Sequence, residues 1–288
     1  MRTRTIAVDG PDRRYRLGLT EWGDPQAPRV VMCVHGLTRN GRDFDPLATA
    51  LAEDARVICP DVIGRGSSER LDDPAHYALP TYAGHLLQLL RADGLAAVSW
   101  VGTSMGGMIG MAIAALEDSP ITKLVLNDVG PFIPKAAIAR IRDYVGREQR
   151  FADQAALEAH LRTVHAPFGP LTDAQWRHLA THSGRAHPEG GLVFHYDPGI
   201  ALPMREAPVE DVDLWELWDR IRCPVLVVRG QESDLLLPET AREMTRRGPP
   251  TELVELDGIG HAPALMAADQ IELIRTWLAR PSAPDEPR

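Results

Sequence analysis

Short strand-like segments recur through the first third of the chain, with helical spacing of apolar residues between them. Residues 3–8 and 13–22 have the composition of two strands joined by a Gly-Pro-Asp turn. Apolar runs at 29–34 and 56–60 predict two buried strands, and 44–52 predicts the helix between them. The chain therefore begins as a mixture of strands and helices around a buried sheet.

The alternation continues on both sides of the middle of the chain. The predicted helices are 81–93, 105–117 and 264–279, and the predicted strands are 98–102, 123–126, 224–228 and 252–256. Short β-branched strands that alternate with helices predict an α/β fold, in which a mostly parallel sheet is flanked by helices on both faces.

The pattern changes between residues 131 and 218. Helices are predicted at 134–145 and 153–164, and a third begins at the capping-box sequence Thr172–Gln175. Its apolar residues Trp176 and Leu179 are expected to face inward, whereas residues 183–210 show no clear period. The predicted organisation is an α/β core of 1–130 and 219–279, a helical cap or lid of 131–218, and a disordered tail of 280–288.

Composition narrows the class of protein without identifying it. The 288 residues are 44% hydrophobic and 25% charged, with a net charge of −9. This acidity argues against a nucleic-acid partner, and no window approaches the ~20 apolar residues of a membrane helix. The first ten residues lack a signal-peptide core, and the three cysteines lie in or beside apolar runs. We expect a cytoplasmic monomer or homodimer that acts on a small molecule.

Candidate chemistry centres on a Gly-x-Ser-x-Gly segment formed by Gly102, Ser104 and Gly106. The pentapeptide alone is a weak signal, but here a predicted strand leads into it and a predicted helix leaves it. Such a sharp turn exposes the serine hydroxyl at the carboxyl edge of the sheet, and the glycines avoid clashes with the neighbouring elements. Ser104 is therefore the predicted nucleophile.

A serine hydroxyl needs a general base to become nucleophilic at neutral pH. His261 is the favoured base because it lies in a glycine-containing loop between the last predicted strand and the last helix. His35 competes for this role but is expected to be packed structurally. His178 and His182 are spaced like a metal pair, yet no Glu accompanies them in an HExxH arrangement, so no metal is predicted.

The acid that orients the base should follow a strand, between the serine and the histidine in the chain. Asp234 is the favoured candidate, Asp128 is its rival and Glu232 is a weaker one. Two backbone N–H groups should stabilise the oxyanion, and those of Leu37 and Met105 are the candidates because they directly follow His35-Gly36 and Ser104.

These segments together resemble the α/β-hydrolase superfamily, in particular its capped, esterase-like members. The quoted motifs are His35-Gly36-Leu37, Asp61 to Ser68 (DVIGRGSS), Gly102 to Gly107 (GTSMGG), Ser233-Asp234 and Gly260-His261. The resemblance implies an eight-stranded, mostly parallel sheet and hydrolysis without a cofactor. It excludes haloalkane dehalogenase and epoxide hydrolase chemistry, because those relatives carry Asp at the position of Ser104.

The favoured function is hydrolysis of a small or medium carboxylic ester, or of a lactone, through an acyl-enzyme on Ser104. Cleavage of a C–C bond or an amide is the alternative within enzymes, with Arg39 as a possible partner for a substrate carboxylate, although a structural ion pair is favoured for Arg39. A slow-turnover ligand receptor that retains the triad is the alternative from another class.

Overall fold

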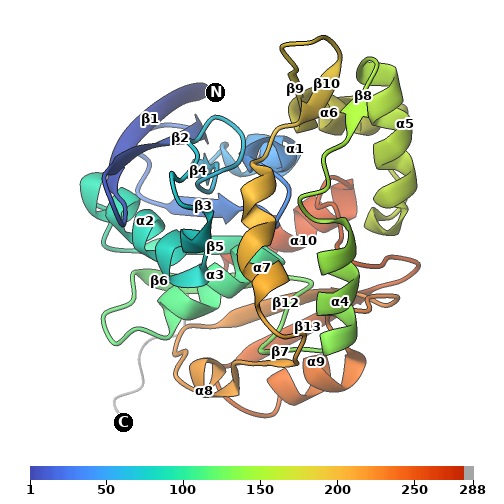
Figure 1. Cartoon of the computed structure of the whole chain (residues 1–288). Coiled ribbons are helices and arrows are strands. Elements are labelled where there is room, and N and C mark those ends of the chain that lie inside the picture. Colours follow the sequence, from blue (N-terminus) through green and yellow to red (C-terminus); the bar gives the residue numbers. More distant parts are fainter. Residues whose placement is uncertain (282–288) are drawn as a thin grey trace.

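A computed structural model describes residues 1–281 and contains one central sheet of eight strands (Figure 1). Only β2 runs antiparallel to its neighbours; the other adjacent strands are parallel. The mostly parallel eight-stranded sheet expected from the sequence is therefore confirmed. From one edge to the other, its strands are β1 (Arg2–Asp9), β2 (Arg14–Trp22), β4 (Arg56–Pro60), β3 (Val30–Val34), β5 (Val98–Thr103), β6 (Ile121–Asn127), β12 (Val225–Gly230) and β13 (Thr251–Leu256).

The central strands are apolar along their whole length because both faces of the sheet are covered. Successive side chains of a strand point to opposite faces, so Met32 and Val34 pack in a different cluster from Val31 and Cys33. One face is covered by α2 (Leu79–Ala92), α3 (Met105–Ala114) and α9 (Pro238–Met244), and the other by α1 (Asp45–Leu51) and α10 (Ala268–Ala279).

The strand order reverses at β3, and this reversal positions the site. The chain passes from β3 to β4 on one side and then crosses to β5 on the other side of β3. Because β3 and β5 are parallel and pair Val34 with Gly102, their carboxyl ends meet at one edge of the sheet. In open α/β sheets, ligands bind in the crevice at such a switch point.

The segment 131–218 folds back along one side of the sheet (Figure 1) and is less purely helical than expected. Its helices are α4 (Lys135–Tyr144), α5 (Gln154–Val164), α6 (Asp173–Ser183), α7 (Leu202–Glu206) and α8 (Trp215–Trp218). Two small sheets accompany them, one of β8 (Arg150–Phe151), β10 (Leu192–Phe194) and β9 (Gly184–Ala186), and one of β7 (Phe132–Ile133) and β11 (Val212–Asp213). The capping box at Thr172 is present, and Trp176 and Leu179 are buried as expected.

Two predicted helix ends differ in the structure, and one helix was not predicted. The last helix begins at Ala268 instead of 264, because residues 261–267 turn across the sheet edge, where the Asn127 side-chain amide donates to the Pro263 carbonyl at 2.8 Å. The helix after Ser104 ends at Ala114, and α9 was not predicted. The expectation of disorder for 282–288 lies outside the described residues. None of the helices within residues 1–281 has the length and apolarity needed to cross a bilayer.

Candidate active site

Ser104 lies in the sharp turn between β5 and α3, with φ 51° and ψ −115°. Positive φ is uncommon for a residue with a side chain, and close packing imposes it here. A Cβ on Gly102 would lie 2.4 Å from the Gly106 carbonyl, and a Cβ on Gly106 would lie 1.9 Å from the Val34 oxygen. Glycine at both positions therefore allows the turn that presents the Ser104 side chain at the sheet edge.

The structure brings Ser104 and His261 together. The His261 Nε2 atom lies 3.0 Å from the Ser104 Oγ, and its Nδ1 atom lies 2.7 Å from an oxygen of Asp128. Since a carboxylate oxygen only accepts, Nδ1–H donates to Asp128 and Nε2 accepts from the serine hydroxyl. This arrangement can remove the hydroxyl proton as the oxygen attacks.

Asp128 follows β6 directly and is fully buried, with φ 56°. Its Oδ1 atom accepts the Gly230 N–H at 2.9 Å, and its Oδ2 atom accepts the Ser233 hydroxyl at 2.5 Å in addition to His261. The N–H comes from the last residue of β12, and the hydroxyl comes from the loop after it. They hold the carboxylate toward His261.

The structure does not bring Asp234 to His261, so the acid assigned from the sequence needs correction. Asp234 is exposed on the surface, and Arg140 of α4 donates to its two carboxylate oxygens at 2.5 and 2.8 Å. Glu232 is also exposed. The loop after β12 turns Ser233 inward and therefore directs Asp234 outward, and Asp128 holds the position next to the histidine.

The two expected oxyanion donors follow Gly36 and Ser104. The peptide bond is planar and trans, so an N–H points away from the carbonyl that precedes it. The Ser104 carbonyl accepts from Gly107 and Met108 inside α3, which directs the Met105 N–H out of the helix start. The Gly36 carbonyl accepts from the Arg39 N–H at 3.1 Å. Within residues 1–281, neither Leu37 N–H nor Met105 N–H has a hydrogen-bond acceptor.

His35 supports this geometry instead of acting as a base. Its Nδ1–H donates to the Gly36 carbonyl at 2.7 Å, and its Nε2 accepts the Val62 N–H at 2.9 Å, so both ring nitrogens are engaged. Burial lowers the pKa of His35 to about 4, which keeps the ring neutral. The histidine thus fixes the peptide group that carries the Leu37 N–H.

Arg65, which sequence reasoning did not single out, connects the two donor residues. Its side chain is 1% exposed. The guanidinium donates to the Leu37 carbonyl at 2.9 Å and contacts the Met105 sulfur at 3.6 Å. One buried cation therefore touches both residues whose N–H groups are unpaired, which places positive charge near the expected position of an oxyanion. The DVIGRGSS segment contained it, but nothing in the sequence indicated where its side chain would reach.

Two other side-chain sets singled out from the sequence lie where the 131–218 segment meets the rest of the fold. Arg39 forms an ion pair with Asp43 at 2.7 Å and donates to Ser183 at 2.8 Å, so it acts structurally here. His178 and His182 are joined by Asp45, a third potential ligand that the sequence pattern did not reveal. Asp45 is already paired with the Arg42 guanidinium at 2.5 Å, which opposes binding of a cation there.

Comparison with known proteins agrees with this geometry. The sequence model of a family described as "Alpha/beta hydrolase family" matches residues 31–272. A 3-hydroxybutyrate-oligomer hydrolase from Cupriavidus necator is 45% identical over 273 residues, which cover 91% of this chain and 92% of the relative.

Solved hydrolase structures are also similar to this chain. A putative hydrolase from Rickettsia typhi has a TM-score of 0.92 at 33% identity and covers 98% of this chain and 100% of its own. An alpha/beta hydrolase from Novosphingobium aromaticivorans has a TM-score of 0.85 at 37% identity, with coverage of 96% and 98%. The family resemblance expected from the sequence is confirmed, and the expected ester-hydrolysing activity agrees with the named relative.

Proposed function

The chain belongs to the alpha/beta hydrolase family, and we propose that it hydrolyses a carboxylic ester through an acyl-enzyme on Ser104. The Ser104 oxygen attacks the ester carbonyl while His261 Nε2 accepts its proton. The alcohol then leaves with that proton. Water attacks the acyl-enzyme with His261 again as the base, and the acid is released as Ser104 regains its proton.

The observation that carries this proposal is the continuous line of contacts from Ser104 through His261 to Asp128. The two distances, 3.0 and 2.7 Å, are hydrogen-bond distances and assign a definite tautomer to the imidazole. Asp128 thereby takes the orienting role that we first expected of Asp234. Its buried carboxylate stabilises the imidazolium that forms as the serine attacks.

Stabilisation of the tetrahedral intermediate is assigned to the N–H groups of Leu37 and Met105. Met105 is the first residue of α3, so the positive end of the helix dipole adds to its N–H. Arg65 adds a cation behind both residues. Because these groups are fixed by hydrogen bonds before substrate binds, no reorganisation is needed in the transition state.

The substrate class we propose is a short oligoester of a hydroxy acid. The support is the name of the Cupriavidus necator relative, together with its 45% identity over 91% of this chain. Each such molecule has an ester carbonyl for Ser104 and a free carboxylate at one end. The cap role of 131–218, the cytoplasmic location and the monomeric or homodimeric state stay predictions from the sequence.

An organophosphonate probe combined with an ester assay tests the proposal. The wild-type protein should be labelled at one serine and should hydrolyse p-nitrophenyl butyrate and linear 3-hydroxybutyrate oligomers. Ser104→Ala should lose both labelling and turnover, whereas Ser119→Ala, in the loop before β6, should keep both. Labelling of another serine, or turnover that survives Ser104→Ala, would contradict the assignment.

A further inference from the structure

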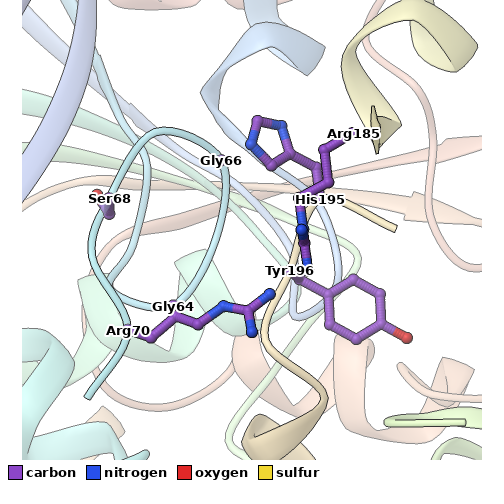
Figure 2. A pocket seen from close by; sticks show the side chains of 7 residues that line it. All are labelled: Gly64, Gly66, Ser68, Arg70, Arg185, His195 and Tyr196. Carbon is purple, nitrogen blue, oxygen red and sulfur yellow. The ribbon is translucent and has the colours of Figure 1, made fainter. Parts of the chain in front are cut away.

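A cavity of about 260 Å³ lies between the core and the 131–218 insertion, and its wall carries an unusual set of side chains (Figure 2). The lining residues are Gly64, Gly66, Ser68, Arg70, Arg185, His195 and Tyr196. Two of them are arginines and none is acidic. A hollow whose only charged groups are cations favours an anionic ligand.

The two arginines come from different parts of the chain. Arg70 follows the DVIGRGSS loop of the core, and Arg185 belongs to β9 of the insertion. In Figure 2 both side chains extend into the space between these segments. Like charges that share one space repel each other, and a bound anion would relieve that repulsion.

Neither arginine is neutralised by a close ion pair in the part of the chain that the structure describes. Arg185 has no carboxylate within 4.0 Å, and its Nε atom is buried without an acceptor among residues 1–281. Arg70 reaches only to 4.0 Å from Asp197. Asp197 is itself engaged, since it accepts the Tyr77 hydroxyl at 2.7 Å. Guanidinium groups with unused donors are suited to carboxylates, which they can bind through two parallel hydrogen bonds.

The cavity wall is held rigidly by backbone hydrogen bonds between core and insertion. The Gly66 N–H donates to the His195 carbonyl at 2.8 Å, and the Asp197 N–H donates to the Gly64 carbonyl at 2.7 Å. Between these bonds, Arg65 and Tyr196 form an isolated antiparallel bridge. A preformed wall lowers the entropic cost of binding.

The same wall is connected to the reaction centre through Arg65. The backbone of Arg65 pairs with Tyr196, which lines the cavity, while its guanidinium contacts Leu37 and Met105. A wider cleft of about 620 Å³ shares Arg70, Arg185 and Tyr196 with the cavity. It adds apolar residues such as Val193 and Phe194, and its charged residues are of both signs: Arg147, Arg150, Glu148, Glu189 and Asp197. An elongated molecule with a charged end and an apolar body matches these surroundings.

We propose that Arg70 and Arg185 form a carboxylate-binding site in this cavity. The inference rests on the proposed function, because a linear oligoester of a hydroxy acid has one free carboxylate, and so does each released hydroxy acid. The site would therefore take either the acid end of the substrate or a free hydroxy-acid product. In the first case it selects substrates, and in the second it couples product concentration to activity.

Matched substrates and matched variants test the site. The linear dimer of 3-hydroxybutyrate is compared with its methyl ester, and cleavage of the inner ester is followed by chromatography. Arg185→Gln and Arg70→Gln are compared with Arg177→Gln, which removes the same charge from an exposed position on α6 of the insertion. Calorimetry with 3-hydroxybutyrate on the same proteins measures binding of the free acid, and p-nitrophenyl butyrate tests the proposed function separately.

If the substrate's own carboxylate binds, Arg185→Gln should lower kcat/KM for the free acid by roughly 10- to 100-fold, the range for one lost charge-assisted interaction. The methyl ester and p-nitrophenyl butyrate should be cleaved as before, and Arg177→Gln should match the wild type. If the released acid binds instead, the substrate ratio, which is kcat/KM for the free-acid dimer divided by kcat/KM for its methyl ester, should be the same in wild type and variants. Calorimetric binding of 3-hydroxybutyrate should then be lost in Arg185→Gln and Arg70→Gln.

The inference is overturned if the substrate ratio and the calorimetric binding are both the same in wild type and variants. If the wild-type protein does not hydrolyse p-nitrophenyl butyrate, that result would instead contradict the proposed function. The calorimetric comparison would still decide whether the cavity binds a carboxylate.

Discussion

Asp128 is the residue that contacts the proposed base, His261, on the side away from Ser104. Its side chain is fully buried, and its carboxylate accepts from His261, Gly230 and Ser233. A buried carboxylate is costly unless donors surround it. The Gly230 N–H and the Ser233 hydroxyl therefore hold this carboxylate beside the imidazole.

We expect Asp128→Asn to lower kcat by about 10⁴, the cost seen when a serine protease loses the acid that fixes its tautomer. Asp234→Asn is the matched control. It removes the same charge from the exposed loop four residues after the end of β12, and it should keep most activity because the Asp234 carboxylate pairs with exposed Arg140. The measurements are kcat with p-nitrophenyl butyrate and thermal unfolding, which shows whether each variant is folded. A dead Asp234→Asn beside an active Asp128→Asn would return the role to Asp234.

Chain order could not separate these two carboxylates, because both lie after a strand and between Ser104 and His261 in the sequence. What separates them is the direction of the loop after β12. Ser233 turns inward to Asp128, so the next side chain points to solvent. The sharp turn that presents Ser104 was predictable because Gly-x-Ser-x-Gly between a strand and a helix has a local steric cause, whereas the position of the proposed acid depends on contacts across 105 residues of sequence.

At the scale of elements, the insertion reaches the site through the 3₁₀ turn Ala166–Phe168 before α6. Phe168 and Leu179 line a small hollow of about 30 Å³ together with Gly36, Thr103 and Ala262, which flank the proposed oxyanion donors, nucleophile and base. The Pro167 carbonyl also accepts the Gly260 N–H at 2.8 Å, directly before His261. The insertion therefore closes the hollow and supports the loop of the proposed base.

We expect Phe168→Ala to enlarge this hollow and change which acyl groups are accepted. The kcat/KM ratio of p-nitrophenyl octanoate to p-nitrophenyl acetate should rise by roughly tenfold, the effect of a few methylenes in an apolar pocket. Phosphonate labelling of Ser104 should persist. Phe151→Ala, in the apolar cluster of the insertion, controls for general loosening. An unchanged ratio in Phe168→Ala, or an equal change in Phe151→Ala, would count against this role of the turn.

Helices and strands with a strong apolar period were predictable from the sequence. Short strands that form only by pairing with distant segments were not. The central strands and α2, α5 and α6 follow from their own apolar spacing, and the capping box gave the start of α6. The two- and three-residue strands β7 to β11 carry too few residues for a period. They exist because distant segments pair, as β8 and β9 do on either side of β10.

Across the whole molecule, several buried or half-buried histidines lie in surroundings that disfavour their charged form. Burial is the first cause in each case: it lowers the pKa of His35 to about 4 and of His182 to about 4, and it also lowers the pKa of His85 and His165. His35 and His85 lie in the core, and His165 and His182 lie in the insertion, so both parts of the fold contain imidazoles with a lowered pKa.

The last prediction concerns acid unfolding. A histidine whose folded pKa lies below its unfolded value of about 6.5 binds more protons when unfolded. Its contribution to stability is therefore complete above pH ~6.5 and is lost as the pH falls toward the folded value.

For His35, with a pKa lowered to about 4, this loss is on the order of 3 kcal/mol. The free energy of unfolding, measured by urea titration, should fall between about pH 6.5 and 4. Burial raises the pKa of the Glu21 carboxyl, but its arginine partners together outweigh burial and lower the pKa to about 2. Glu21 therefore adds a loss of stability only at lower pH. His85→Leu removes one of these groups from α2, away from Ser104, and should flatten the pH dependence in that window. A stability that is constant from pH 7 to 4.5 in the wild type would show that neutral histidines do not govern it.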